Sequence, residues 1–139
     1  MANNDGDIRP AVAAAIQSIS PHTEGVQRTT FRLPWLQGIP LNEAEMVGIA
    51  EALSCSTHLE EVELIAGVRG SLAAATSTFL CKILETHPSI RKIDLQQNQI
   101  NNSMAEAIGL ALKTNASLKV LGLYYDDIGD VGAEALAEG

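Results

Sequence analysis

The sequence predicts an α/β fold in which strand–helix units repeat along the chain behind an N-terminal helical cap. Three observations predict it. An alternating apolar motif recurs at intervals of 31 and 28 residues, each copy precedes a stretch with helical spacing, and an amphipathic segment precedes the first unit. Each unit alone would leave an apolar face uncovered, and stacking of neighbouring units covers that face. The repeat period therefore decides the fold class.

The strand of each unit is predicted from apolar residues at the first, fourth and sixth positions of the motif. Alternation between apolar and polar residues is typical of a short strand with one buried face. The clearest copies place these residues at Leu59, Val62 and Leu64, at Ile90, Ile93 and Leu95, and at Leu118, Leu121 and Leu123.

The helix of each unit is predicted from apolar residues spaced three and four apart. In the third unit this spacing extends from Ser103 to Lys113. We expect Asn102 or Ser103 to cap the start of this helix, and Lys113 to suit its negative end. The apolar face consists of Met104, Ala107, Ile108, Ala111 and Leu112.

The same spacing of the motif divides the chain into a cap and a series of repeats. The predicted repeats cover 28–58, 59–89 and 90–117, followed by a truncated unit at 118–139. The first repeat departs from the pattern, because Arg28 stands where an apolar residue is expected. Residues 1–27 form the predicted N-terminal cap, and its amphipathic helix covers 8–19.

The most regular segments resemble a known family. Residues 90–100 (IRKIDLQQNQI) lead into an alanine-rich helix, and 118–136 repeat the same order of strand, loop and helix. Both segments resemble the ribonuclease-inhibitor type of leucine-rich repeat. The resemblance implies a leucine-rich-repeat solenoid with parallel short strands on the concave face and helices on the convex face. It also implies binding of a protein partner through the concave face and the loops at the strand ends.

The strand ends supply the residues that we expect to contact this partner. Tyr124 and Tyr125 follow the last predicted strand, and Trp35 and Ile65 fall at the matching positions of earlier units. Exposed aromatic side chains are a residue type that anchors protein interfaces. Two alternatives stay open: the tyrosines could cover a missing next repeat, and Trp35 could cover the N-terminal cap.

Charged residues occupy the outward strand positions and should stack in columns, because neighbouring parallel strands lie about 4.8 Å apart. Glu63 and Asp94 share one column, and we expect them to tune the electrostatics of the binding face. The alternative is that the charges on this face mainly neutralise one another. The expected ion pairs are Arg32 with Glu63, Glu60 with Arg91, and Glu61 with Lys92.

Composition argues against several kinds of function. The 139 residues carry 17 acidic and 9 basic side chains, a net charge of −8, whereas nucleic-acid binding requires clustered lysine and arginine. The sequence has neither a signal peptide nor an apolar stretch of the ~18 residues that span a membrane, so we expect a cytoplasmic protein with no membrane partner. Because its histidines and two cysteines are scattered, we expect no metal and no cofactor.

Two further hypotheses concern function. The chain stops within a repeat and lacks a polar closing unit, which favours a structural subunit or fragment whose C-terminal edge self-associates or completes a larger assembly. Alternatively, Arg69 lies in a predicted rim loop, where Ran GTPase-activating proteins of the same repeat type carry a functional arginine. No other catalytic pattern is present. We therefore expect a non-enzymatic interaction module, with Arg69 among its partner-binding residues.

Overall fold

A computed structural model of the chain shows strands and helices in regular alternation. It describes residues 7–19, 29–33, 39, 41–65 and 73–139, with the backbone alone for 73–77. The elements are, in order, α1 (Pro10–Gln17), β1 (Thr30–Arg32), α2 (Glu43–Cys55), β2 (Glu61–Glu63), α3 (Ala73–Thr86), β3 (Lys92–Asp94), α4 (Asn102–Leu112), β4 (Val120–Gly122) and α5 (Asp130–Glu138).

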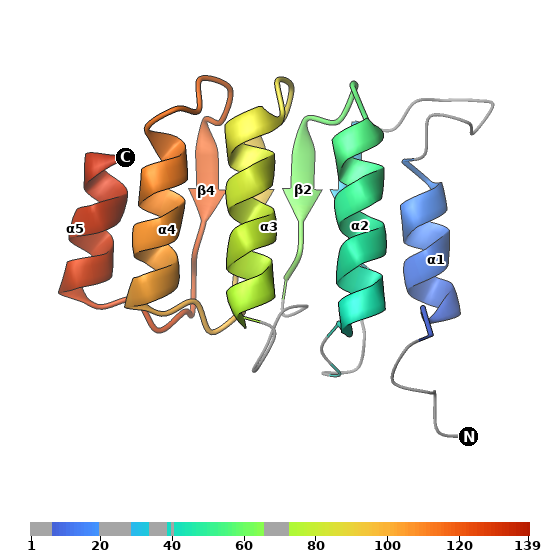
Figure 1. The fold of residues 1–139 in the computed structure, drawn as a ribbon, viewed down its shortest axis with the longest axis horizontal. Helices are drawn as coiled ribbons and strands as arrows, with labels where there is room; N and C mark the ends of the chain where they lie inside the picture. The colour runs from blue at the N-terminus through green and yellow to red at the C-terminus, as the bar shows by residue number, and fades with distance from the viewer. Residues whose placement is uncertain (1–6, 20–28, 34–38, 40, 66–72) are drawn as a thin grey trace.

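The strands form one parallel sheet in the order β1–β2–β3–β4, and the helices lie side by side along one of its faces (Figure 1). Thr30 pairs with Glu61, Glu61 with Lys92, and Lys92 with Val120, so successive strands are 31, 31 and 28 residues apart. The parallel α/β arrangement and the predicted columns of outward residues are therefore confirmed. The face of the sheet opposite the helices carries those outward side chains and is called the open face below.

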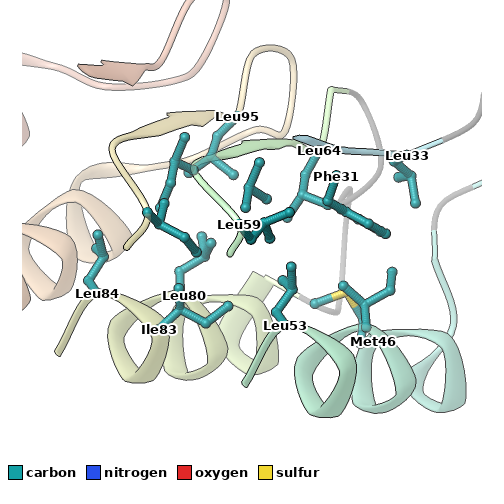
Figure 2. Close-up of a cluster of buried hydrophobic side chains, with 14 of the residues drawn as sticks. Phe31, Leu33, Met46, Leu53, Leu59, Leu64, Leu80, Ile83, Leu84 and Leu95 are labelled. Carbon is teal, nitrogen blue, oxygen red and sulfur yellow. The ribbon is translucent and has the colours of Figure 1, made fainter. Parts of the chain in front are cut away.

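The core lies between the sheet and the helices (Figure 2). The middle residues of the first three strands, Phe31, Val62 and Ile93, are at most 1% exposed. They meet fully buried leucines from the helices, among them Leu53 of α2 and Leu80 of α3. Each such side chain contributes roughly 1.5–3 kcal/mol through burial. The alternating motif therefore stabilises the fold through its inward residues and leaves the outward residues available for contacts.

The cap of α4 differs from the expected one. Asn101 accepts a hydrogen bond at 3.0 Å from the backbone N–H three residues later. Asn102 instead serves α5, because its Oδ1 accepts from the N–H groups of Gly129 at 2.8 Å and Gly132 at 3.3 Å. The expectation that Asn102 or Ser103 caps α4 is therefore wrong. The chain enters the helix one residue earlier, and α5 packs close enough to use the side chain of Asn102.

Side chains in the turns after the helices join successive units. The Nε2 atom of buried His87 hydrogen-bonds to the carbonyl oxygen of Leu53 at 3.1 Å. At the equivalent place in the next unit, Asn115 Nδ2 donates to the carbonyl oxygen of Leu84 at 2.6 Å. Each bond satisfies a carbonyl group at the end of the preceding helix. These hydrogen bonds, together with the packing of the core, therefore fix the position of each repeat unit relative to the next.

Helix α1 is shorter than the predicted segment 8–19 and is attached through its N-cap residue, Arg9. Arg9 Nη2 lies 2.6 Å from Oε2 of Glu45, while the Nε and backbone N–H groups of Arg9 donate to Oε1 at 2.7 and 2.9 Å. Glu45 is fully buried and also completes a capping box with Asn42 at the start of α2. Burial raises the pKa of Glu45, but the hydrogen bonds from Arg9 and Asn42 outweigh it, so this pKa lies below its usual value.

Candidate protein-binding face

Ion pairs link the charged side chains of β1, β2 and β3 on the open face. Arg32 Nε lies 2.6 Å from Oε2 of Glu63. Lys92 Nζ lies 3.9 Å from Oε1 of Glu63 and 3.8 Å from Oε2 of Glu61. The hydrogen bond to Glu63 raises the pKa of Arg32. The pairing of Arg32 with Glu63 and of Glu61 with Lys92 is therefore confirmed.

The third expected ion pair, Glu60 with Arg91, is absent. The charged groups of these two described residues do not lie within 4.0 Å of each other. The Glu63 side chain keeps only 12% of its surface exposed, between Arg32 and Lys92. Arg32 remains 72% exposed, and ion pairs in contact with water contribute little to stability. The charge of Glu63 is thus neutralised within the sheet.

Asp94 has a different environment in the same column. Its Oδ1 accepts a hydrogen bond from the backbone N–H of Gln96 at 3.2 Å, and its Oδ2 accepts from Nε2 of Gln96 at 2.8 Å. Its partner in the strand register is Gly122, which has no side chain to cover it. Sequence reasoning missed Gln96, although its place two residues after Asp94 puts it on the same side of an extended chain. These bonds hold the carboxylate in position.

Tyr124 and Tyr125 lie in the turn directly after β4 and are the most exposed large hydrophobic residues of the described part, at 70% and 83%. Tyr125 has a φ of 59°, in the left-handed region that bulky residues rarely adopt. Gln97, at the equivalent position of the preceding unit, has a φ of 61°. The turn shape therefore repeats, and here it carries an aromatic ring. Ile65, at the end of β2, is also exposed.

The turn that carries the tyrosines is anchored to the preceding unit. The Nδ2 atom of buried Asn98 donates to the carbonyl oxygens of Leu64 at 2.8 Å and Leu95 at 2.6 Å. Asp126 takes the equivalent position in the next unit, and its Oδ1 accepts from the N–H groups of Asn98 at 2.9 Å and Ile100 at 3.1 Å. Asn98 thus binds backbone carbonyl groups of its own turn and of the preceding unit, and Asp126 links the tyrosine turn to Asn98.

Asp126 satisfies its hydrogen-bonding groups less completely than Asn98 does. Its Oδ2 atom is buried and has no hydrogen-bond partner among the described atoms. Burial raises the pKa of Asp126, and its backbone hydrogen bonds, which act in the opposite direction, do not cancel this effect; neighbouring Asp127 adds to the rise. The turn is therefore held through Oδ1, while the other carboxyl oxygen is poorly accommodated.

Two predicted site residues, Trp35 and Arg69, lie outside the described residues. The described site therefore brings together Tyr124 and Tyr125 at one sheet edge, with Asp94 on the neighbouring strand. Within the described ranges, no group of histidine, cysteine, aspartate and glutamate side chains is arranged to hold a metal ion. No helix in those ranges is both long and apolar enough to cross a membrane.

Comparison with known proteins supports the repeat assignment. No protein-family model matches the chain. The human (Homo sapiens) protein named NACHT, LRR and PYD domains-containing protein 12 is 29% identical over 120 residues, which are 84% of this chain and 11% of that protein. Both its printed name and the repeats described above point to the same class. This similarity supports a protein of the leucine-rich-repeat type. The chain spans about a ninth of the length of this relative.

A solved structure has a similar fold. The tropomodulin C-terminal domain of Caenorhabditis elegans matches this chain with a TM-score of 0.53 and 13% sequence identity. The match covers 91% of this chain and 89% of that domain. At this level of identity the likeness concerns the fold alone.

Proposed function

We propose that this chain is a non-enzymatic protein-interaction module of the ribonuclease-inhibitor type of leucine-rich repeat. Its partner binds the open face of the sheet and the turns at the strand ends, with Tyr124 and Tyr125 as anchors. We assign Ile65, Glu63 and Asp94 to the same interface, together with Trp35 at a predicted strand end and Arg69 in a predicted rim loop. We also propose the division into a cap at 1–27 and repeats at 28–139.

The exposure of the tyrosine turn is the observation that carries this proposal. Two adjacent aromatic rings in contact with water gain little from the fold that holds them, and tyrosine is among the residues that dominate protein interfaces. The left-handed backbone of Tyr125 adds a local strain that a glycine would avoid. A side chain retained at such a position is better explained by a contact with another molecule than by the stability of the fold.

The anchoring of the turn supports the same proposal. Asp126, next to Tyr125, accepts hydrogen bonds from the backbone N–H groups of Asn98 and Ile100, and the carbonyl oxygen of Tyr124 accepts from the N–H of Gln97, so the preceding unit fixes the backbone around the tyrosines. A preformed binding surface loses less conformational entropy when a partner binds. We further propose an intracellular setting, because the sequence holds only two cysteines, too few for the disulfide framework typical of secreted domains.

Affinity capture from an extract of source cells tests the function. The wild type is compared with a Tyr124→Ala/Tyr125→Gly double variant, in which glycine suits the left-handed backbone at position 125. Leu110→Ala is the matched control, because Leu110 is 65% exposed but lies on α4. We expect mass spectrometry to identify a partner with the wild type and the control, and at least about tenfold less of it with the double variant. A partner captured equally by all three proteins would contradict the proposal.

A further inference from the structure

Asp94 carries a negative charge on the open face that no cationic side chain of the described residues pairs with. Among the acidic residues within the strands, Glu61 and Glu63 each have a cationic group within 3.9 Å. In the part of the chain that the structure describes, Asp94 has no lysine, arginine or histidine within ion-pair distance. Such a carboxylate is complementary to a cationic group from a partner.

The carboxylate of Asp94 is also held in place. Within the described residues, Gln96 donates to it twice, at 3.2 Å from the backbone N–H and at 2.8 Å from the side-chain amide. These donors are neutral, so they orient the carboxylate without removing its charge. A carboxylate oriented in this way loses little freedom when it binds a cation.

The surface between Asp94 and the tyrosines carries no outward side chain of β4. A Cβ atom placed on Gly122 would lie 2.9 Å from Oδ1 of Asp94, so the carboxylate extends over the glycine. The next residue, Leu123, packs against the core. Tyr124 follows, two residues or about 7 Å along the chain from Gly122. A group bound to Asp94 over Gly122 is therefore two residues along the chain from the exposed Tyr124.

We propose that the protein partner places an arginine side chain on Asp94, beside Tyr124. This inference rests on the proposed function and specifies the chemistry of the contact. A planar guanidinium donates two parallel N–H groups to a carboxylate and stacks on an aromatic ring. Lysine offers a compact, strongly hydrated charge that does neither. The occupant of this surface is therefore an arginine-bearing segment of another protein.

The test titrates the full chain with three capped alanine pentapeptides that differ only at the central residue. That residue is arginine, lysine or citrulline, which has nearly the shape of arginine without its charge. Binding is followed by NMR through the side-chain amide of Gln96, the backbone amide of Gly122 and the ring of Tyr124. We expect the arginine peptide to bind about fivefold more tightly than the citrulline peptide, with lysine between them.

Two variants with the same change in net charge separate the contact from general electrostatics. Asp94→Asn keeps the shape of the side chain and should remove the preference for arginine over citrulline. Glu106→Gln should keep it, because Glu106 is an exposed residue of α4 and not part of the open face. Equal binding of arginine and citrulline to the wild type would overturn the proposal. So would an arginine preference that survives Asp94→Asn, or no spectral shift with any of the peptides.

Affinity capture distinguishes failure of this proposal from failure of the proposed function. If Asp94→Asn captures the partner at the wild-type level and the Tyr124→Ala/Tyr125→Gly variant does not, the arginine contact is wrong and the binding face stands. If both variants capture it at the wild-type level, the proposed function and the arginine contact are both overturned. Loss of the partner in both variants supports both.

Discussion

Two carboxyl groups in different regions of the molecule have opposite environments. At the start of α2, Glu45 accepts hydrogen bonds from Arg9 and Asn42 and has a lowered pKa. In the turn after β4, Asp126 accepts two backbone hydrogen bonds through one oxygen, while its other oxygen has no partner among the described atoms. Burial raises the pKa of Asp126. The first region is optimised for stability, and the second is not.

The difference teaches where the fold tolerates unfavourable features. The turn after β4 combines the incompletely bonded Asp126, the left-handed backbone of Tyr125 and two exposed rings. Unfavourable local features of this kind persist where they serve another role. The contrast therefore supports the assignment of partner binding to this turn, and three measurements sharpen it.

The largest expected effect comes from breaking the contact between Arg9 and Glu45. Arg9→Met leaves a buried carboxylate without its cation and should lower the free energy of unfolding by about 3 kcal/mol at neutral pH. Because the folded pKa of Glu45 is lowered, its stabilisation is present above the usual value of 4.5 and is lost as the pH falls through the folded pKa. The stabilities of wild type and variant should therefore converge in acid.

Urea unfolding followed by circular dichroism, at neutral and acidic pH, measures this effect. Arg32→Met is the matched control, since it removes an arginine whose ion pair with Glu63 faces water. The control should unfold at nearly the same urea concentration as the wild type. Equal losses in the two variants would show that net charge, rather than burial of Glu45, explains the result.

A smaller effect, of opposite sign, is expected in the turn after β4. Asp126→Asn keeps the oxygen that accepts hydrogen bonds from Asn98 and Ile100. It replaces the second carboxyl oxygen with an NH₂ group, the group through which Asn98 donates in the preceding unit. We expect the free energy of unfolding to rise by about 1 kcal/mol at neutral pH. Asp127→Asn changes the same charge on an exposed side chain and should have less effect.

The pH dependence of this gain follows from the raised pKa of Asp126. A carboxyl group whose folded pKa is raised contributes stability below its unfolded value, near 3.8, and loses that contribution as the pH rises through the folded pKa. The advantage of Asp126→Asn should therefore grow from acidic to neutral pH. An advantage that is constant with pH, or greatest in acid, would contradict this account of Asp126.

The features of the fold that repeat could be predicted from the sequence. The motif period fixed the strand register, which brought Arg32, Glu63 and Asp94 into one column as expected. The contact between Arg9 and Glu45 could not be found in this way, since it joins residues 36 positions apart and has no counterpart in the repeats. The cap of α4 was misassigned because three polar residues, Asn101, Asn102 and Ser103, stand together and only packing of α5 decides among them.

The candidate site was predictable in type and less so in detail. An exposed aromatic residue at this strand end can be predicted from the motif, because Tyr124 comes directly after Leu123, the last inward-facing position of the motif. The hydrogen bonds of Asp94 depend on the side-chain conformation of Gln96, and the left-handed backbone of Tyr125 depends on the turn. The first property has no periodic signal in the sequence, and the second recurs at Gln97 without a shared residue type that would reveal it.

The most direct test of the central claim measures stability and partner capture together on the Tyr124→Ala/Tyr125→Gly variant. If the tyrosines serve binding, the variant should capture at least about tenfold less partner while its free energy of unfolding stays the same or rises by up to about 1 kcal/mol, because glycine relieves the backbone of position 125. A variant that loses stability but still captures the partner would contradict the claim, since the tyrosines would then support the fold rather than binding.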